Sequence, residues 1–196
     1  MMSVRIIGGT ARGRRLKSPS SKVVRPVSAR LRQSLFSIIT GELDSAEVLD
    51  LFAGIGSFGL EALSRGAGRC VFVERSPACA TALRTNIEEL GFADRSKVLQ
   101  ADALGALKAF EVSRAGFDVA FVDPPYEVTD DPRKSGTIFS GLERAAENGV
   151  FREGALVMVR KRSEAPGPRG LDSLVLEESR KYTHSEVLFF RARRSA

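Results

Sequence analysis

The stretch Val48–Gly59 reads VLDLFAGIGSFG and contains, in order, a buried strand, a glycine-rich turn and the start of a helix. Its first five residues are apolar except for Asp50, which is typical of a strand covered on both faces of a sheet. Its last six residues have the spacing G-x-G-x-x-G, which lets a ligand approach the backbone at the start of a helix. The stretch therefore predicts a sheet that carries a cofactor at the end of one strand.

Strand and helix patterns alternate along the rest of the chain. Apolar runs predict strands at 48–52, 70–73, 97–100, 118–122 and 155–159, and a closing hairpin at 174–182 and 187–191. Helical spacing predicts helices that begin at 60, cover 78–90, run from 103 to about 110, and cover 138–148. This alternation indicates the α/β class, with a Rossmann-like, mostly parallel sheet covered by helices on both faces.

The first 41 residues differ in charge from the rest of the chain. They contain nine Lys or Arg residues and no acid, whereas residues 42–196 contain 21 basic and 24 acidic residues. The net charge of +6 therefore combines a strongly basic arm with a slightly acidic body. A solvated tail is one explanation, but such an excess of cations favours a polyanionic partner.

The arm has its own local pattern. We expect a short strand at 4–7, then an irregular or hairpin segment at 10–27. A helix should follow, capped by Ser28 and ending at Gly41. Residues 1–41 are thus expected to form an arm with its helix, and residues 42–196 the main domain.

The 196 residues are 43% hydrophobic and 28% charged, as in a globular protein. No apolar run approaches the ~20 residues of a membrane span, and no signal-peptide segment follows the N-terminus. The cysteines Cys70 and Cys79 and the lone His184 are too few for a disulfide framework or a zinc site. We expect a cytoplasmic protein with no metal and no membrane partner.

Four acidic residues stand at the carboxyl ends of four successive predicted strands: Asp50, Glu74, Asp102 and Asp123. Ligands of open α/β sheets bind beyond these ends. One acid there would carry little information, whereas four indicate a single ligand site along that edge.

Two cofactors are compatible with the glycine turn. Glu74 follows Gly54 by 20 residues, where an acid binds the ribose of a dinucleotide. Asp50, however, would repel a pyrophosphate and attract the ammonium and sulfonium charges of S-adenosylmethionine. No Gly-Lys-Ser/Thr follows the turn, so a P-loop is not indicated. We expect S-adenosylmethionine, with Asp102 and Ala103 near its adenine; the full expected set is Asp50, Phe52, Ala53, Gly54, Gly56, Glu74, Arg75, Asp102 and Ala103.

The segment Asp123-Pro124-Pro125-Tyr126 predicts the chemistry. Proline has no N–H, so this backbone offers carbonyl acceptors without competing donors. The Asp123 carboxylate and the Pro124 carbonyl can each accept one hydrogen of an exocyclic amine, and Tyr126 can stack on its base. A pyrimidine carbon-5 methyltransferase would need a cysteine nucleophile, and both cysteines fall inside a predicted strand or helix.

At these residues the chain resembles a known family. The motifs Asp50–Gly56, Gly59–Ala67 and Asp123–Tyr126 are similar to those of class I methyltransferases that act on exocyclic nitrogen. The arm motifs resemble the bacterial RsmD family more closely, at Arg5–Gly9, Arg12–Leu16, Arg25–Pro26 and Arg32–Phe36. The chain departs from the usual family pattern at Val27, Gln33 and Ser34.

The resemblance implies a seven-stranded sheet with an antiparallel last strand, and S-adenosylmethionine as methyl donor. It also implies N2 of a guanine in 16S ribosomal RNA as acceptor, within the small subunit or its assembly intermediate. We therefore expect a monomeric ribosomal RNA guanine-N2 methyltransferase. The residues expected to contact RNA phosphates are Arg5, Arg12, Arg14, Arg15, Lys17, Arg25, Arg30 and Arg32.

Two alternatives remain open from the sequence. Adenine-N6 DNA methyltransferases use the same Asp-Pro-Pro-Tyr motif, but they usually carry a long target-recognition insertion. Only ordinary strand and helix patterns lie between the glycine turn and Asp123. An NAD-binding protein, or a non-catalytic RNA-binding protein, is the alternative from a different class.

Overall fold

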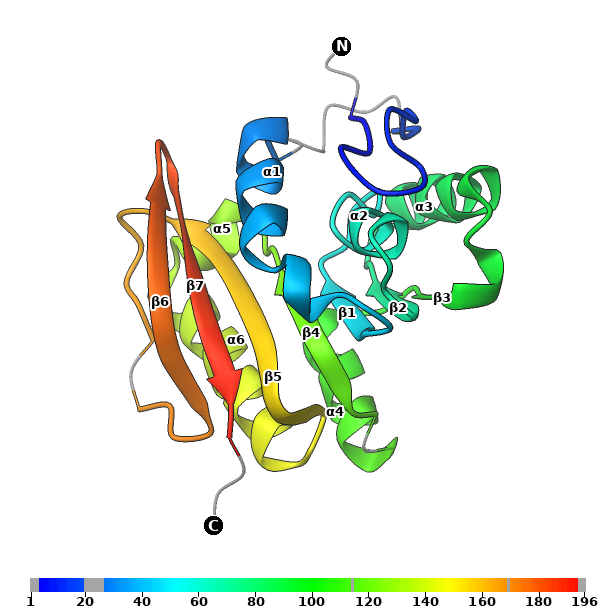
Figure 1. Cartoon of the computed structure of the whole chain (residues 1–196). Helices are drawn as coiled ribbons and strands as arrows, with labels where there is room; N and C mark the ends of the chain where they lie inside the picture. The colour runs from blue at the N-terminus through cyan, green and yellow to red at the C-terminus, as the bar shows by residue number, and fades with distance from the viewer. Residues whose placement is uncertain (1–3, 20–26, 114, 169, 194–196) are drawn as a thin grey trace. The chain divides into compact units, whose positions relative to one another are not determined.

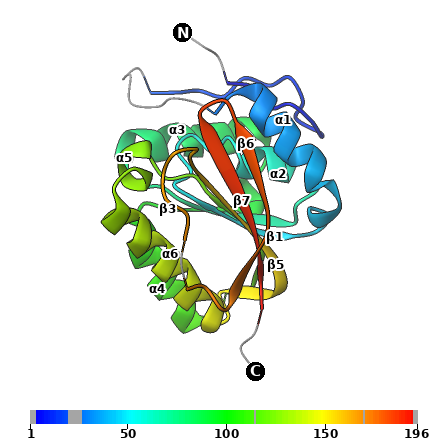
Figure 2. The same cartoon turned by 90° about the vertical axis from the view of Figure 1, so that its left-hand side faces the viewer.

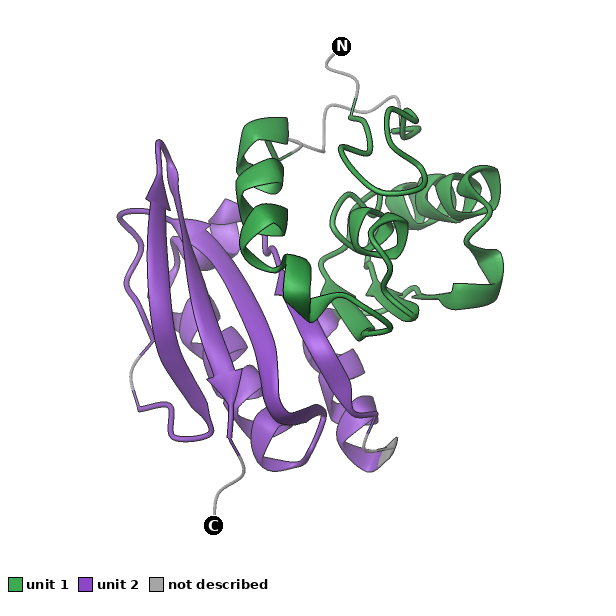
Figure 3. Cartoon of the chain, in the orientation of Figure 1, with its two compact units in different colours: residues 1–102 green, residues 103–196 purple. Residues whose placement is uncertain are grey.

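A computed structural model describes residues 4–19, 27–113, 115–168 and 170–193 of the chain. These residues belong to two compact units, residues 1–102 and residues 103–196 (Figure 3). Among the described residues, no helix combines the length and apolarity that crossing a membrane requires.

The described residues of unit 1 form three parallel strands and three α-helices (Figure 1). Its elements in chain order are α1 (Ala29–Ile38), η1 (Thr40–Glu42), β1 (Glu47–Leu51), α2 (Gly59–Ser64), β2 (Arg69–Val73), α3 (Pro77–Leu90), η2 (Ala93–Arg95) and β3 (Ser96–Leu99). β1 pairs with β2, and β2 pairs with β3. The strand expected at 48–52 is β1 and begins and ends one residue earlier. The helix expected at 78–90 is α3 and begins one residue earlier.

The ends of the helices in unit 1 follow from capping residues. Ser28 caps α1, because its hydroxyl accepts the Leu31 N–H at 3.2 Å. Gly91, with a φ of 73°, ends α3 as its sequence position predicts. The expected end of α1 at Gly41 is wrong: the helix ends at Ile38, and Gly41 lies in the short turn η1.

In the part of unit 2 that the structure describes there are four strands and three helices. Its elements are α4 (Ala103–Ser113), β4 (Phe117–Val122), α5 (Tyr126–Thr129), α6 (Pro132–Glu147), β5 (Phe151–Arg162), β6 (Leu174–Tyr182) and β7 (Ser185–Ala192). α6 begins six residues earlier than the expected 138, because Asp131 caps it by accepting the N–H groups of Arg133 and Lys134. The short helix α5 was not expected.

The seven strands have the order β3-β2-β1-β4-β5-β7-β6 in one sheet. β4 pairs parallel with β5, whereas β7 is antiparallel to both β5 and β6. The expected α/β class is confirmed, as is the seven-stranded, mostly parallel sheet with an antiparallel last strand.

Apolar packing fixes the helices of each unit. In unit 1, Gly59 opens α2 so close to β2 that a Cβ there would lie 2.3 Å from the Phe72 ring and 2.6 Å from Cys70 Sγ. In unit 2, α6 packs along α4 (Figure 2), and Phe139 of α6 meets Phe190 of β7 edge to face at 6.3 Å. These contacts hold the strand ends, where the expected site residues lie.

Candidate functional site

The glycine turn and Glu74 meet in unit 1 as their spacing predicts. Oε2 of Glu74 accepts the Gly54 N–H at 2.8 Å, and Oε1 accepts the Ser76 N–H at 2.6 Å. The half-buried carboxylate is thus held by two backbone donors. Because an ionised carboxylate has about four acceptor positions, each oxygen retains a lone pair for a ligand hydroxyl.

The backbone around Gly54 is shaped to approach a ligand. Gly54 has a φ of 57°, and a Cβ there would meet no described atom within 4 Å, so space is open beside it. Phe52 also has a positive φ, 62°. Non-glycine residues rarely adopt this conformation, and such strain concentrates at ligand sites.

Asp50 supports the turn from inside. The side chain is 1% exposed, and Oδ2 accepts the Gly59 N–H at 2.9 Å. This bond ties the end of β1 to the first residue of α2. Burial and the Asp50 charge also raise the pKa of the Cys70 thiol, which keeps it protonated within the core.

The remaining expected cofactor residues lie at the ends of neighbouring strands. Ala53 is buried and donates its N–H to the Val73 carbonyl at 3.0 Å, while Gly56 has a φ of 86°. Arg75 and Asp102 are exposed after β2 and β3. Ala103 is the buried first residue of α4.

The Asp-Pro-Pro-Tyr segment follows β4 in unit 2. Asp123 Oδ1 accepts Nε of Arg160 at 2.5 Å, and Nη1 of Arg160 donates to the Tyr126 hydroxyl at 2.7 Å. Tyr126 is the first residue of α5, which Pro125 caps by accepting the N–H groups of Val128 and Thr129. One arginine therefore joins the expected amine acceptor to the expected base-stacking ring.

A second arginine also contacts this ring. Cζ of Arg162 lies 4.4 Å from the Tyr126 ring centroid, compared with 4.9 Å for Arg160. Nε of Arg162 pairs with both oxygens of Asp130 at 3.0 Å. Neither arginine is among the site residues expected from the sequence, because the predicted strand ends at Val159. The run of three basic residues directly after this buried strand is the sequence feature that could have pointed to them.

The expected arm is an ordered hairpin over residues 4–19 of unit 1. Ile6 donates its N–H to the Arg14 carbonyl at 3.0 Å, and Leu16 donates to the Val4 carbonyl at 2.9 Å. The expected strand at 4–7 is reduced to a single bridge between Arg5 and Arg15.

This hairpin is bound to α2 and α3. The Glu61 carboxylate, 0% exposed, accepts the N–H groups of Ile7 at 2.7 Å and Gly8 at 2.8 Å. The Lys17 N–H donates to Oδ1 of Asn86 at 2.7 Å. The backbone of the hairpin therefore faces the helices, which leaves its long cationic side chains outside.

Most of the residues expected to contact phosphates are exposed in the structure. The exposed cations are Arg5, Arg12, Arg14, Arg15, Lys17 and Arg30. Arg14 also donates to the Glu89 carbonyl, and Lys17 pairs with the Glu89 carboxylate. Arg25 lies outside the described residues.

Arg32 is a correction. Its side chain is 2% exposed, because it shares one face of α1 with Leu35 and Phe36, whereas an exposed side chain that contacts RNA phosphates was expected. Its guanidinium donates to the Arg5 carbonyl at 3.0 Å and lies 3.8 Å from the Glu61 carboxylate. Arg32 therefore supports the hairpin from inside and cannot meet a phosphate in this conformation.

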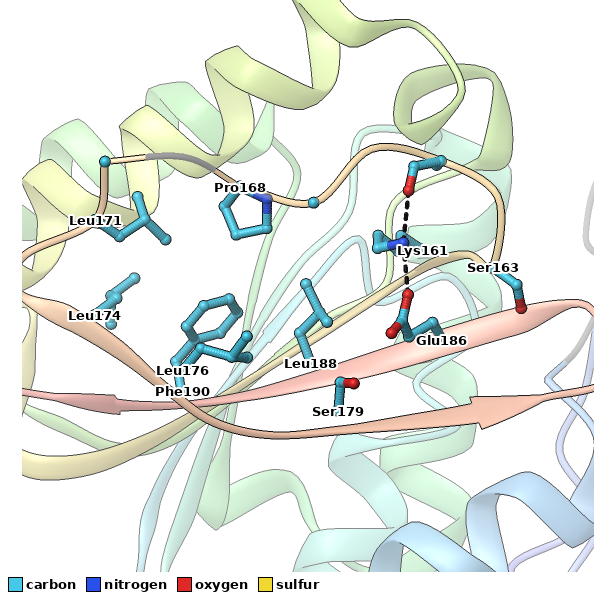
Figure 4. Close-up of a pocket in the computed structure, with 13 residues that line it drawn as sticks. Lys161, Ser163, Pro168, Leu171, Leu174, Leu176, Ser179, Glu186, Leu188 and Phe190 are labelled. Carbon is cyan, nitrogen blue, oxygen red and sulfur yellow. Dashed lines mark hydrogen bonds and ion pairs between the residues drawn. The ribbon is translucent and has the colours of Figure 1, made fainter.

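A cavity of about 500 Å³ in unit 2 lies apart from these residues. Apolar side chains such as Leu171, Leu174 and Phe190 line one part, and Lys161 lies at the other, between Glu186 and the Ala165 carbonyl (Figure 4). None of the expected site residues lines it.

Comparisons with known proteins identify the family of this chain. The family model described as Conserved hypothetical protein 95 matches residues 4–191. Ribosomal RNA small subunit methyltransferase D of Haemophilus influenzae is 33% identical over 168 residues, which cover 83% of this chain and 81% of that protein. The protein of the same name from Escherichia coli K12 is 33% identical over 161 residues, which cover 82% of this chain and 76% of the other.

A solved structure extends the likeness over the whole chain. The hypothetical protein TTHA0928 of Thermus thermophilus has a TM-score of 0.79 and 29% sequence identity, and the match covers 98% of this chain and 99% of that one. The resemblance to the RsmD family is thereby confirmed. This chain belongs to the family of ribosomal RNA small subunit methyltransferase D, which the Conserved hypothetical protein 95 model describes.

Proposed function

We propose that this methyltransferase transfers a methyl group from S-adenosylmethionine to the exocyclic N2 of a guanine in 16S ribosomal RNA. The substrate is the small ribosomal subunit or its assembly intermediate, and the enzyme acts as a cytoplasmic monomer. One observation carries the choice of an exocyclic amine: the Asp123 carboxylate, directly after β4, is fixed by Arg160 beside a proline backbone. The relatives named for small-subunit ribosomal RNA support the choice of RNA.

The residues of unit 1 fit the cofactor. The open space at Gly54 and the two anchored oxygens of Glu74 suit a ribose with two hydroxyls. The buried charge of Asp50 favours a cationic ligand over a pyrophosphate. When bound, S-adenosylmethionine supplies an electrophilic methyl group on its sulfonium. We assign to its binding Asp50, Phe52, Ala53, Gly54, Gly56, Glu74, Arg75 and Asp102 of unit 1, together with the next residue in the chain, Ala103.

The residues after β4 fit the acceptor. An exocyclic amine is a weak nucleophile, because its lone pair is delocalised into the base. Asp123 and the Pro124 carbonyl can each accept one of its hydrogens, which favours a pyramidal nitrogen whose lone pair points away from the ring. The Asp123 charge also stabilises the positive charge that develops on this nitrogen. Tyr126 stacks on the base, an interaction of roughly 1–3 kcal/mol, and Pro125 fixes the start of α5.

The hairpin provides the contacts to phosphates. Its backbone is bound to α2 and α3, so the exposed cations stand on a rigid support. Phosphate contacts position the substrate without reading its sequence. The sequence specificity then falls to the residues around Asp123 and Tyr126 and to the shape of the ribosomal particle.

A pair of experiments separates this function from its rivals. Calorimetric titration should show binding of S-adenosylmethionine and none of NAD; NAD binding alone would contradict the proposal. Radiolabelled methyl transfer should occur on small ribosomal subunits that lack the modification and not on duplex DNA. Transfer to DNA adenine would favour the DNA methyltransferase, and cofactor binding without transfer to any RNA would favour the non-catalytic protein.

A further inference from the structure

The end of β5 presents three consecutive basic residues to different neighbours. Arg160 and Arg162 both contact Tyr126, whereas Lys161 pairs with Glu186 of β7 at 2.7 Å. This division follows from the period-two alternation of side chains along a strand. β5 extends through these residues because each of them pairs with β7.

Arg160 makes two directional contacts from one guanidinium. Nε donates to Asp123 Oδ1 at 2.5 Å, and Nη1 donates to the Tyr126 hydroxyl at 2.7 Å. The Arg160 and Asp123 side chains are each only 16% exposed. A planar guanidinium fixes both the distance and the orientation of its partners, which a lysine ammonium does not. The contact therefore sets the rotation of the Asp123 carboxylate.

That rotation determines what the carboxylate offers to a ligand. Oδ1 is engaged by Arg160, and no described residue donates a hydrogen bond to Oδ2. Among the described residues, none donates to the Pro124 carbonyl either. Asp123 Oδ2 and the Pro124 carbonyl are thus both available to the amine. Because Arg160 occupies Oδ1, it determines which carboxylate oxygen the amine meets.

The charges around Asp123 have opposing effects on its ionisation. Burial raises the pKa of the Asp123 carboxyl and outweighs the charge and hydrogen bond of Arg160, which lower it, so the net shift is upward. Burial also acts to lower the pKa of Arg160, but Asp123 and Tyr126 outweigh it, and the net shift is upward. Among the described residues, Arg162 of β5 and Asp130 at the end of α5 are charged groups that also face this cluster. Without Arg160, Asp123 would gain a proton at higher pH.

We propose that Arg160 is the positioning residue of the acceptor site, which holds the Asp123 carboxylate and the Tyr126 ring in their working orientation. This inference rests on the proposed methyl transfer to an exocyclic amine. Arg160 touches neither the amine nor the cofactor in this assignment. It acts through Asp123, which must stay ionised and correctly rotated.

The test compares three full-length variants. Arg160→Gln removes the charge, Arg160→Lys keeps the charge without the forked geometry, and Arg152→Gln is the matched control. Arg152 also lies on β5 and pairs with an aspartate of β4, Asp118, but at the exposed opposite end of the strand. Methylation of small ribosomal subunits is measured across a pH series, together with affinity for S-adenosylhomocysteine.

Arg160→Gln should lower kcat by about 100-fold near neutral pH, the effect of misplacing a reacting group by about 1 Å. Cofactor affinity should not change. The acid limb of its pH–rate profile should move to higher pH, so that the deficit shrinks as the pH rises. Arg160→Lys should return the acid limb towards the wild-type position while kcat stays low. Arg152→Gln should match the wild type.

A second measurement does not depend on activity. In ¹³C-aspartate NMR titrations, the Asp123 carboxyl, assigned with Asp123→Asn, should titrate at higher pH in Arg160→Gln than in the wild type. An unmoved acid limb and an unmoved titration would overturn the role of Arg160, whatever the loss of kcat. If the titration moves but the wild type methylates no RNA, the hold of Arg160 on Asp123 stands and the proposed function fails.

Discussion

The Glu61 carboxylate on α2 accepts the backbone N–H of Ile7 at 2.7 Å, although 54 residues separate the two. The same carboxylate pairs with Arg65 at 2.7 Å and has Arg32 at 3.8 Å. A fully buried acid thus ties the basic hairpin to unit 1 and is itself neutralised from two sides. The hairpin is part of the folded unit, and its removal would delete the buried side chains of Ile6 and Leu16 as well as charge.

Replacing Glu61 should therefore destabilise the protein. Glu61→Gln leaves Arg32 buried without its countercharge, and breaking a buried pair costs about 3–5 kcal/mol. Urea unfolding should show that loss in the free energy of unfolding. Glu88→Gln, at an exposed position of α3, should change it by less than about 0.5 kcal/mol. Equal stability of both variants would mean that Glu61 does not anchor the hairpin.

Neutralising exposed cations of the hairpin should weaken RNA binding without changing the fold. Arg12 and Arg15 are exposed, and each phosphate contact adds roughly 0.7–0.9 to the salt slope of binding. The double variant Arg12→Gln/Arg15→Gln should lower the slope by about 1.4–1.8 if both residues touch phosphates. Affinity for ribosomal particles, measured at several salt concentrations, gives the slope. Arg180→Gln on β6 is the control. An identical slope in the wild type, the double variant and the control would show that Arg12 and Arg15 of the hairpin do not contact RNA phosphates.

Glu74→Gln should weaken cofactor binding. The amide replaces one acceptor oxygen with a donor facing a backbone N–H, and hydrogen bonds to charged groups contribute about 1.5–3 kcal/mol each. The Kd for S-adenosylhomocysteine should rise about 10–100-fold in calorimetry. Asp94→Asn, in the exposed turn η2, should bind like the wild type. A folded Glu74→Gln protein with wild-type affinity would remove Glu74 from the ribose site.

Two substitutions of Tyr126 separate its ring from its hydroxyl. Tyr126→Phe keeps the stacking surface and loses only the bond from Arg160, so kcat/KM should fall less than about tenfold. Tyr126→Ala removes a stack of about 1–3 kcal/mol, so the loss should approach 10–100-fold. Steady-state kinetics on ribosomal particles provides both values. Comparable losses in the two variants would show that the hydroxyl, rather than stacking, is what the site requires.

The part of the site built by local connections could be predicted from the sequence. Parallel pairing of β1 with β2 places Leu51 opposite Val73, so the residues that follow both strands meet at one edge. The 20-residue spacing between Gly54 and Glu74 therefore indicates that these two residues lie close together. The four-residue motif after β4 could also be recognised in the sequence, because the groups expected to bind the acceptor lie on consecutive residues.

The parts that depend on distant packing could not be predicted. Arg160 reaches Asp123 across 37 positions, and β5 extends that far only because β7 pairs with it. The sequence predicts a surface cation at Arg32, although its position three and four residues before Leu35 and Phe36 puts it on their face of α1. Arg32 can be buried there because it pairs with the Glu61 carboxylate and donates a hydrogen bond to the Arg5 carbonyl. Both partners come from other parts of the chain.

The residues after β4 are proposed to direct a methyl group to the exocyclic N2 of guanine. The most direct measurement uses small ribosomal subunits that lack the modification, incubated with S-adenosylmethionine and either the wild type or Asp123→Asn. Their RNA is then digested and its nucleosides are analysed by mass spectrometry. N2-methylguanosine should form with the wild type, and at least about 100-fold less of it with Asp123→Asn, while the cofactor affinity stays unchanged. N6-methyladenosine as the product, or a fully active Asp123→Asn enzyme, would contradict this proposal.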